Sequence, residues 1–344
     1  MEVTGLTRRI SVRQQSDAGD ARRQASQAAE SARLDPECSG RLATITAEMA
    51  SNLLKHTANG GDVLINALVP ASGSGAVELI AIDRGPGMRR VATLMEDGRS
   101  SAGTLGIGLG AIRRHASHFD IHSVPGRGTA VLARVHANGG LPGHPGFDIG
   151  VVTVPKDGEM VSGDSWAVTA KPDGIQVLVV DGLGHGLLAS EAASAAIRAY
   201  RQTAGPPVDV LRALHPALRG TRGATVGVAD VDTRSHVVTF GGIGNIAAAV
   251  FSEGGARRLV SLNGTVGREP VSYQQFHAEW DPGATLILHS DGLMTQWRLD
   301  YLPGLAAKDP SLIAAVLFRD FARELDDVTV LVAREGSPAR NGES

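Results

Sequence analysis

Aspartates stand beside apolar runs at four points in the second half of the chain. They are Asp164, Asp181, Asp291 and the adjacent pair Asp326 and Asp327. If each apolar run is a strand, the carboxylates gather at one rim of a sheet. Bare carboxylates that close together would repel one another and raise one another's pKa. A divalent cation removes that penalty, and an all-oxygen donor set favours Mg²⁺ or Mn²⁺ over Zn²⁺.

This acidic pattern indicates phosphate-ester hydrolysis. Two ions about 3.5–4 Å apart can hold a water between them, lower its pKa and let it attack phosphorus in line. A single Asp-Gly pair is typical of a turn. The stretch Asp181–Gly186 reads Asp-Gly-Leu-Gly-His-Gly, which is rarer. The pattern leaves open whether His185 donates to phosphate or only shapes the turn.

Polar residues in the first half suit a nucleotide. Glu48 and Asn52 lie four residues apart on a predicted helix, so both project from one face, roughly opposite the apolar stripe of that helix. A carboxylate beside an amide suits hydrated Mg²⁺ or a water that is being deprotonated. Asp83 ends an apolar strand and can accept from an exocyclic amine. Gly85 and Gly87 let the backbone approach a ring.

A glycine-rich run, Gly103–Gly110, leads into another predicted helix. Exposed amides at a helix N-terminus bind phosphate. Alone, the run is a weak signal, because it lacks the Lys-Ser/Thr ending of a Walker loop and does not follow a strand. Each of the three segments alone is also explained as a solvated helix face or a turn. Their order along the chain is what favours a nucleotide site.

The elements that position these residues fall on either side of a segment rich in glycine and proline. In the first half, periodicity predicts helices over 21–32, 40–56 and 108–116, and strands over 63–68, 77–82 and twice within 120–135. In the second half it predicts strands over 150–154, 166–170, 175–180, 224–230, 236–240, 246–251, 285–289 and 328–333, and helices over 189–202 and 208–218. We therefore expect a nucleotide domain over 1–137, a linker over 138–147, a hydrolytic domain over 148–335 and a disordered tail over 336–344.

Composition narrows the class of protein. The chain has 344 residues, 42% of them hydrophobic, a net charge of -3 and one cysteine. This length favours two domains, and the near-neutral charge argues against a nucleic-acid binder. The lone Cys38 excludes an internal disulfide, and no apolar run reaches the roughly 18–20 residues that a membrane span needs. We expect a cytoplasmic protein with neither nucleic acid nor membrane as partner.

The first half resembles the Bergerat ATP-binding fold of the GHKL superfamily, which includes gyrase, Hsp90, histidine kinases and MutL. The resemblance is carried by the N-box helix with Glu48 and Asn52, the D-x-G-x-G loop Asp83–Gly87 and the G-x-G-x-G segment Gly106–Gly110. The stretch Glu96–Gly106 is similar to the lid of RsbT-like serine/threonine kinases from bacterial partner-switching modules. This resemblance implies an α/β sandwich that binds ATP with Mg²⁺.

The same resemblance implies a role for each matching residue. Asn52 would ligate Mg²⁺, and Glu48 would be the catalytic base that activates the acceptor hydroxyl. Asp83 would hold the adenine amine with help from Thr129. The residues that would bring backbone to the nucleotide are Gly85, Gly87, Gly106, Gly108 and Gly110. Lys55 either reaches a phosphate or is a surface lysine.

The second half resembles the SpoIIE branch of the PPM metal-dependent serine/threonine phosphatases, and most of all the short RsbX-like members. The matching motifs are Ser162–Asp164, Asp181–Gly186, Ser290–Gly292 and Asp326–Thr329. The family fold is an α-β-β-α sandwich that binds two Mn²⁺ or Mg²⁺ ions. Ser-Gly before Asp164, where the family often has two glycines, is a mild departure.

The phosphatase resemblance also implies a ligand set. Asp164, Asp181 and the backbone carbonyl of Gly182 would bind one ion. Asp181, Asp291 and Asp326 would bind the other, with Asp327 as the alternative to Asp326. Asp181 and Asp291 would then be central to catalysis.

Together the two resemblances predict an α+β, two-domain, bifunctional switch protein. The first domain would phosphorylate Ser or Thr on a STAS-domain anti-sigma antagonist of a stressosome-like module, and the second would remove that phosphate. Such a phosphate adds roughly −1.5 to −2 charges and so changes partner choice. In the alternatives, the first domain sequesters a sigma factor, senses ATP beside a phosphatase that alone is catalytic, or simply hydrolyses ATP. A sigma factor or a downstream phosphatase activator is a further candidate partner.

Overall fold

The computed structural model describes residues 6–70, 73–89, 91, 105–137, 146–268, 272–323 and 325–336. The chain forms two compact units. The N-terminal unit comprises Thr7–Pro142 together with Arg298–Arg319. The C-terminal unit comprises Met1–Leu6, Gly143–Trp297 and Asp320–Ser344.

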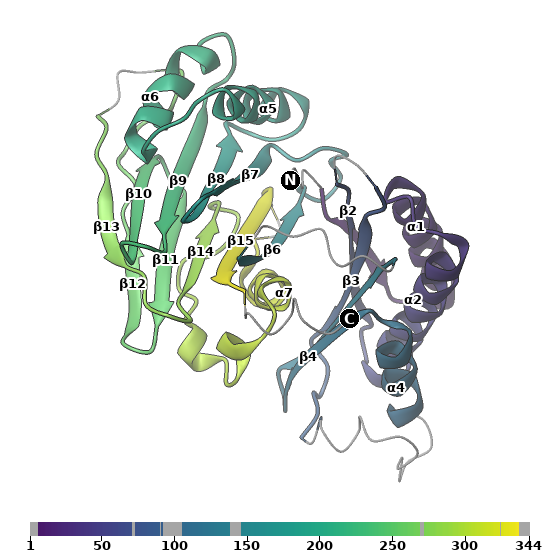
Figure 1. The fold of residues 1–344 in the computed structure, drawn as a ribbon. Coiled ribbons are helices and arrows are strands. Elements are labelled where there is room, and N and C mark those ends of the chain that lie inside the picture. Colours follow the sequence, from purple (N-terminus) through teal and green to yellow (C-terminus); the bar gives the residue numbers. More distant parts are fainter. Residues whose placement is uncertain are drawn as a thin grey trace. The chain divides into compact units, whose positions relative to one another are not determined.

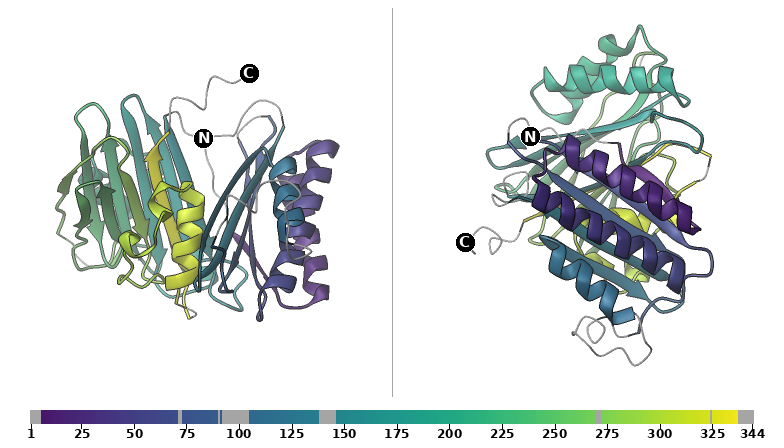
Figure 2. Two further views of the ribbon diagram at one scale, coloured as in Figure 1. Left: turned by 90° about the horizontal axis from the view of Figure 1, so that it is seen from below. Right: turned by 90° about the vertical axis from the view of Figure 1, so that its right-hand side faces the viewer.

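The N-terminal unit contains a five-stranded antiparallel sheet in the order β1-β2-β3-β5-β4. Helices α1, α2 and α4 lie side by side over one face of this sheet (Figures 1 and 2). The elements are β1 (Arg8–Val12), α1 (Gln15–Ser31), α2 (Pro36–His56), β2 (Gly61–Leu68), β3 (Ala76–Asp83), α4 (Leu105–His115), β4 (His118–Val124) and β5 (Gly128–His136).

Helix α2 is the element that carries Glu48 and Asn52. It begins at a cap where Asp35 accepts a hydrogen bond of 2.7 Å from the backbone N–H of Cys38, and proline follows the cap at position 36. Its apolar stripe is buried against the sheet and consists of Leu42, Ile45, Met49 and Leu53. This burial fixes the rotation of the helix. Glu48 and Asn52 are half-buried beside the stripe and not opposite it, which differs from the prediction.

The segment Arg298–Arg319 belongs to the N-terminal unit although it lies between β14 (Thr285–His289) and β15 (Val328–Glu335) in sequence. It contains two short 3-10 turns, η1 (Leu299–Tyr301) and η2 (Leu305–Ala307), and most of α7 (Pro310–Phe321). Arg134 of β5 donates to both carboxylate oxygens of Asp309, at 2.8 and 2.6 Å. The same guanidinium donates to Glu78 of β3 at 2.7 Å.

All three side chains of this ion-pair network are at least 92% buried. Burial alone would raise the pKa of Asp309, but the charge of Arg134 and hydrogen bonds from His118 and Arg134 hold it well below its usual range. Residues 298–319 lie within the predicted domain 148–335, and their contacts group them with the N-terminal unit. The buried ion pair is a physical reason for that packing.

The C-terminal unit contains two five-stranded antiparallel sheets, in the orders β13-β10-β9-β8-β7 and β12-β11-β14-β15-β6. Helices α5 and α6 pack on the first of these sheets (Figure 1). The remaining elements are β6 (Phe147–Val154), β7 (Asp164–Lys171), β8 (Gly174–Gly182), α5 (Leu187–Arg201), α6 (Pro207–Leu218), β9 (Ala224–Asp232), β10 (Val237–Ile243), β11 (Ala247–Ser252), β12 (Gly255–Leu259) and β13 (Phe276–Glu279).

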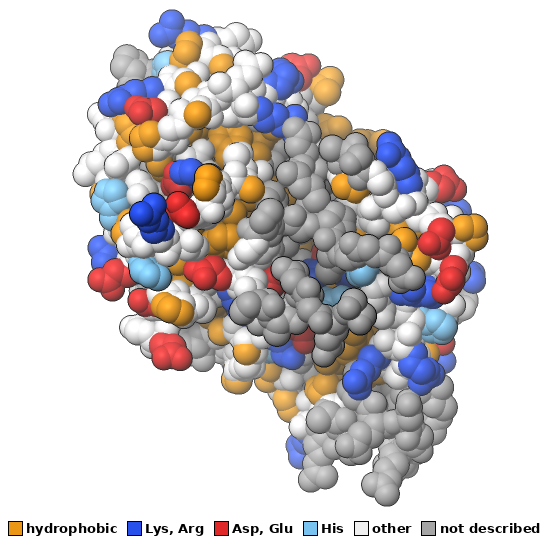
Figure 3. Space-filling model, in the orientation of Figure 1, with side chains coloured by type: hydrophobic (Ala, Val, Ile, Leu, Met, Phe, Trp, Pro, Cys, Tyr) orange, Lys and Arg blue, Asp and Glu red, His pale blue; other side chains and the backbone are white. Residues whose placement is uncertain are grey.

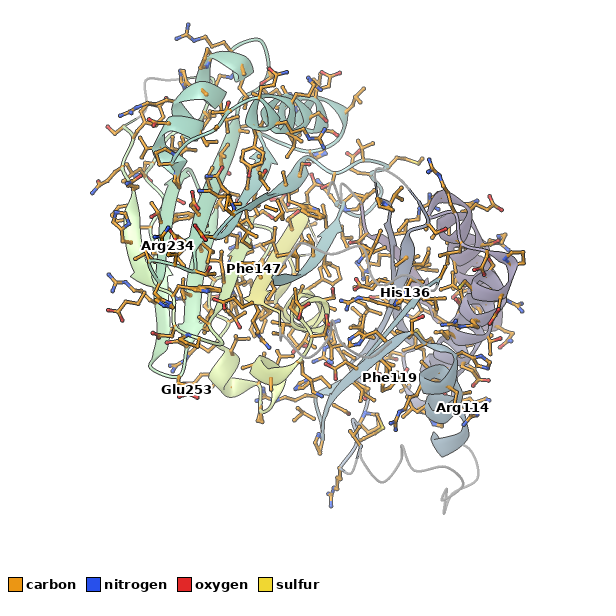
Figure 4. The ribbon with its side chains drawn as sticks, viewed as in Figure 1. Arg114, Phe119, His136, Phe147, Arg234 and Glu253 are labelled. Atoms are coloured by element: carbon orange, nitrogen blue, oxygen red, sulfur yellow. The ribbon has the colours of Figure 1, made fainter. Side chains whose placement is uncertain are left out.

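The core of the C-terminal unit lies between its two sheets. Val177 and Val179 of β8 contribute from the first sheet, and Leu286 and Leu288 of β14 contribute from the second. Phe147, labelled on β6 in Figure 4, lies in the same core, and its ring centroid is 6.2 Å from that of Trp280. Strand β8 has a long apolar run that leads to Asp181, and β14 ends two residues before Asp291. Packing of these strands in the core therefore fixes where both aspartates lie.

The structure confirms the predicted mixed α/β architecture in two parts with antiparallel sheets. The helices and strands predicted from periodicity are present, with ends that differ by a few residues. Sequence periodicity missed β1, β12, β13 and α7. The predicted linker over 138–147 and tail over 336–344 fall almost wholly outside the described residues, and the proposed domain boundaries stay predictions.

The surface carries no extended patch of one charge in the view of Figure 3, where acidic and basic side chains of the described residues are interspersed among apolar ones. No helix in the described part of the chain has both the length and the hydropathy that crossing a membrane requires.

Candidate active sites

A cavity of about 350 Å³ lies in the N-terminal unit and is bordered by residues of α2, β3, α4 and β5. Five residues predicted to bind a nucleotide line it, namely Asn52, Lys55, Asp83, Gly87 and Thr129. The other lining residues are mainly apolar and include Met49, Leu53, Ala81, Met88, Leu109, Ile112 and Val131. An apolar cavity with a few fixed polar groups is the usual form of a small-molecule site.

Asp83 is fixed at this cavity by its neighbours. Its Oδ1 accepts from the backbone N–H of Gly85 at 2.7 Å and of Thr129 at 3.3 Å. Burial raises the pKa of Asp83, and these two N–H donors oppose that rise. The hydroxyl of Thr129 lies 2.9 Å from the hydroxyl of Ser123. A carboxylate held this way presents a defined acceptor to a ligand amine.

Glu48 and Asn52 meet the glycine-rich helix α4 at Gly108. A Cβ atom added to Gly108 would lie 2.8 Å from Asn52 Oδ1 and 3.1 Å from Glu48 Oε2. The backbone of α4 therefore approaches both polar side chains more closely than any other residue would allow. Glu48 does not line the cavity itself, but it adjoins Asn52 at this point.

Gly87 is needed for its backbone conformation. Its φ is +64°, and an added Cβ would lie 2.2 Å from the carbonyl oxygen of Val124. Gly85 and Gly110 are not among the described residues that line the cavity. Gly106 lies in the first turn of α4, and the rest of the predicted lid stretch Glu96–Gly106, apart from Leu105, lies outside the described residues.

The arrangement fits a nucleotide with a hard cation. The apolar walls suit a flat ring, Asp83 offers an acceptor, and the amide of Asn52 beside the Glu48 carboxylate offers oxygen ligands for Mg²⁺. Lys55 lines the cavity and is exposed, so its role toward a phosphate stays a prediction. Burial lowers the pKa of the neighbouring His56, which favours its neutral form.

A second cluster of polar residues lies in the C-terminal unit. Asp164 and Asp181 are directly opposite each other on the paired strands β7 and β8. Burial raises the pKa of both carboxyls well above the usual range. Repulsion adds to this effect for Asp181, first from Asp164 and then from Asp291, Asp326 and Asp327. The four predicted positions therefore act on one another electrostatically, as a single acidic site.

Hydrogen bonds orient two of these carboxylates. Ser290 Oγ donates to Asp164 Oδ2 at 2.5 Å, while Asp164 Oδ1 is buried without a hydrogen-bond partner. Asn245 Nδ2 donates to Asp291 Oδ2 at 2.6 Å, and its own Oδ1 accepts from Thr225 at 2.6 Å. Sequence reasoning missed Asn245, because it lies in a short turn between β10 and β11 that carries no periodic signal.

Asp326 and Asp327 have different surroundings. Both oxygens of Asp327 accept backbone N–H groups, from Lys156 and from Gly163, each at 2.8 Å. These two hydrogen bonds hold the segment that precedes Asp164 next to Asp327. Asp326 accepts the N–H of Asp327 through Oδ1 at 3.0 Å. The geometry favours Asp326 over Asp327 as a ligand.

The donor chemistry of this cluster fits hard divalent cations. No three Asp, Glu, His or Cys side chains of the described residues form a preassembled ligand group, and several carboxylates instead accept the hydrogen bonds above. Buried Asp164 Oδ1 nevertheless lacks any donor, and the cluster contains only oxygen ligands. Asp164, Asp181, the Gly182 carbonyl, Asp291 and Asp326 are the groups that would hold Mg²⁺ or Mn²⁺.

His185 lies in the loop that follows Asp181. Its Nδ1 is 2.7 Å from Glu159 Oε1, so the side chain joins this loop to the one before Asp164. Glu159 was not predicted as a site residue. A Cβ at Gly186 would lie 3.0 Å from Glu159 Oε2, which shows how closely the two loops approach.

Comparisons with known proteins identify both parts of the chain. Residues 12–135 match the histidine kinase-like ATPase domain, and residues 171–335 match the stage II sporulation protein E (SpoIIE) family. The chain is 37% identical to the serine/threonine-protein kinase RsbT of Bacillus subtilis (strain 168) over 93 residues, which cover 27% of this chain and 68% of RsbT. It therefore belongs to the RsbT-type histidine kinase-like ATPase family.

The same polypeptide carries a phosphatase domain of the SpoIIE type. The phosphoserine phosphatase RsbX of Bacillus subtilis (strain 168) is 27% identical over 145 residues, which cover 42% of this chain and 73% of RsbX. A solved structure from work on the bacterial stressosome matches with a TM-score of 0.51 and 28% identity, and covers 55% of this chain and 99% of that one. The SpoIIE match begins after Asp164, so geometry rather than the match places that residue.

Proposed function

We propose that the chain is a bifunctional partner-switching enzyme. Its N-terminal unit transfers the γ-phosphate of ATP to Ser or Thr of a STAS-domain antagonist protein. Its C-terminal unit hydrolyses phosphoserine or phosphothreonine on STAS-domain partners. One observation carries the proposal. The N-terminal unit holds an apolar cavity with polar groups that suit a nucleotide, and the C-terminal unit holds a buried acidic cluster.

The kinase half rests on the approach of Glu48, Asn52 and Gly108. Asn52 holds the cation that accompanies ATP, and Glu48 orients the acceptor hydroxyl and takes its proton. Asp83 selects adenine by accepting from its amine. The similarity to RsbT, a serine/threonine-protein kinase, supports transfer to a hydroxyl rather than to histidine.

The phosphatase half rests on the aspartates that surround Asp181. When bound, two divalent cations neutralise the phosphoryl oxygens and lower the pKa of an attacking water. The protein contributes the ligands, and Asn245 and Ser290 hold Asp291 and Asp164 in place. The similarity to RsbX, a phosphoserine phosphatase, supports a protein substrate.

Labelling of STAS-domain proteins from the same organism tests the proposal. The full chain is incubated with each purified STAS protein, radiolabelled ATP and Mg²⁺, and the labelled protein is then repurified and returned to enzyme with Mn²⁺. Asn52→Ala should abolish labelling and leave removal intact, whereas Asp181→Ala should do the reverse.

Two matched variants control for general damage. Ser51→Ala changes the residue next to Asn52 on α2, and Asp173→Asn changes an exposed aspartate before β8, at the strand end remote from Asp181. Both should retain both activities. Loss of both activities in Asn52→Ala and in Asp181→Ala alike would contradict the division of labour, and wild-type enzyme that labels no STAS protein would contradict the kinase half.

A further inference from the structure

Large apolar side chains are exposed around the acidic cluster of the C-terminal unit. Met160 is 89% exposed, Leu187 is 66% exposed and Leu325 is 81% exposed. Leu183 and Leu188 are exposed as well. We call these five residues the apolar rim. Single exposed leucines are common on protein surfaces, but a group of them beside one site marks an interaction surface.

The rim residues belong to three segments that carry the predicted metal ligands. Met160 precedes Asp164, and Leu325 directly precedes Asp326. Leu183 lies in the loop after Asp181, and the remaining two begin α5 directly after that loop. Of the eight large hydrophobic residues that are exposed in the described part of the chain, these three segments hold five. The exposed apolar surface of the described chain is therefore concentrated at this site.

Hydrogen bonds bring the three segments together in space. The Met160 segment contacts the loop after Asp181 through Glu159 and His185, at 2.7 Å. The N–H of Gly182 donates to the carbonyl of Gly163 at 3.0 Å. The N–H of Gly163 also donates to Asp327 at 2.8 Å, which joins the segment that carries Leu325. The rim residues thus border one site rather than five separate places.

The position of the rim determines what covers it. A phosphorylated side chain reaches the acidic cluster only when the protein that carries it lies over the segments around the cluster. The residues that flank the phosphorylated side chain on that protein then lie against the rim. Apolar residues at those positions would be desolvated against leucine and the adaptable side chain of methionine.

We propose that the apolar rim is the docking surface for the phosphorylated partner protein, which presents apolar side chains beside its phosphoserine or phosphothreonine. This inference rests on the proposed phosphatase activity and adds the chemistry by which that site selects its substrate. The acidic cluster would hold the cations that activate water, and the rim determines which phosphorylated surface is held there long enough to react.

Two synthetic phosphoserine peptides and p-nitrophenyl phosphate test the rim in the full-length protein with Mn²⁺ present. The peptides are identical except that three leucines flanking phosphoserine in one are serines in the other. Wild type should hydrolyse the leucine peptide with a kcat/KM about tenfold higher, mainly through KM. The double variant Leu187→Ser/Leu188→Ser should remove this preference and leave p-nitrophenyl phosphate hydrolysis within about twofold of wild type.

Val260→Ser is the matched control, because Val260 is 56% exposed in the same unit and follows β12, outside the three segments. It should keep the preference. Equal rates on the two peptides in wild type, or a preference that survives in the double variant, would overturn the docking assignment while p-nitrophenyl phosphate is still hydrolysed. If wild type hydrolysed none of the three substrates, the proposed phosphatase activity would fail, and the docking assignment with it.

Discussion

Replacing Asp309 with asparagine tests whether the segment Arg298–Arg319 is bound to the N-terminal unit by its buried ion pair. Arg134 is only 8% exposed at its side chain and donates to both oxygens of Asp309. Asp309→Asn keeps the shape and one acceptor, but removes one of the two negative charges that face the guanidinium. Glu78 remains as the other.

Breaking a buried ion pair on one side costs about 3–5 kcal/mol. Because Glu78 still neutralises part of the charge and asparagine still accepts one hydrogen bond, we expect a cost of about 3 kcal/mol at the lower end of that range. With a urea m-value of about 2 kcal/mol per molar, this cost moves the unfolding midpoint down by about 1.5 M.

The two units are distinguishable by spectroscopy. All three tryptophans, at positions 166, 280 and 297, lie in the C-terminal unit, whereas helical circular dichroism comes from α1, α2 and α4 of the N-terminal unit as well as from α5 and α6 of the C-terminal unit. Urea unfolding of Asp309→Asn should therefore shift the part of the circular dichroism transition that comes from the N-terminal unit and leave the tryptophan fluorescence midpoint in place. The control Asp20→Asn removes an exposed partner of Arg23 and should change neither midpoint measurably.

Two outcomes would refute this reasoning. A circular dichroism midpoint that moves by less than about 0.5 M would show that the ion pair adds little to stability. In that case the cost of desolvating the two charges offsets their attraction. A fluorescence midpoint that falls together with the dichroism midpoint would show that the loss is not confined to the N-terminal unit.

Three further predictions follow from single contacts. Asn245→Ala removes the donor to Asp291 and should weaken Mn²⁺ binding about 10- to 100-fold in titration calorimetry, with unchanged binding as the contrary result. Gly108→Ala places a methyl group 2.8 Å from Asn52 Oδ1 and should weaken ATP binding at least about tenfold in equilibrium dialysis, while circular dichroism stays that of wild type. The pKa of Asp309 is lowered on folding, so its stabilisation is fully present above the unfolded value near 4 and is lost progressively as pH falls from there toward the much lower native pKa. The difference in urea midpoint between wild type and Asp309→Asn should therefore be smaller at pH 3 than at pH 7.

Local sequence patterns were sufficient for the elements that carry the motifs. Helix α2 has its apolar stripe at Leu42, Ile45, Met49 and Leu53, and the three- and four-residue spacing specifies which face is buried. Spacing also places Glu48 and Asn52 on one face, but it predicts that face roughly opposite the stripe, whereas both residues lie half-buried beside it. Their roles toward ATP stay predictions that the labelling experiment addresses.

Contacts between residues that are far apart along the chain leave no comparable pattern in the sequence. Asn245 meets Asp291 across 46 positions, and Glu159 meets His185 across 26. Neither asparagine nor glutamate in a turn is unusual, so nothing local distinguishes these two from solvated surface residues. Strand β1 was missed for a related reason, since five residues that include Arg8 and Arg9 acquire their strand conformation by pairing with β2.

The segment Arg298–Arg319 shows how packing can group residues differently from their order along the chain. It lies between the motifs of Asp291 and Asp326 and within the SpoIIE match over 171–335, yet its contacts group it with the N-terminal unit. Asp309, however, is 2% exposed at its side chain, and a buried carboxylate requires a cation. The partner it finds is Arg134, which itself requires an anion beyond Glu78 to satisfy its five donors. The pairing of these two buried charges is therefore a physical reason why the segment packs with the ATPase sheet. A kinase domain cut at residue 137 would leave Arg134 without Asp309.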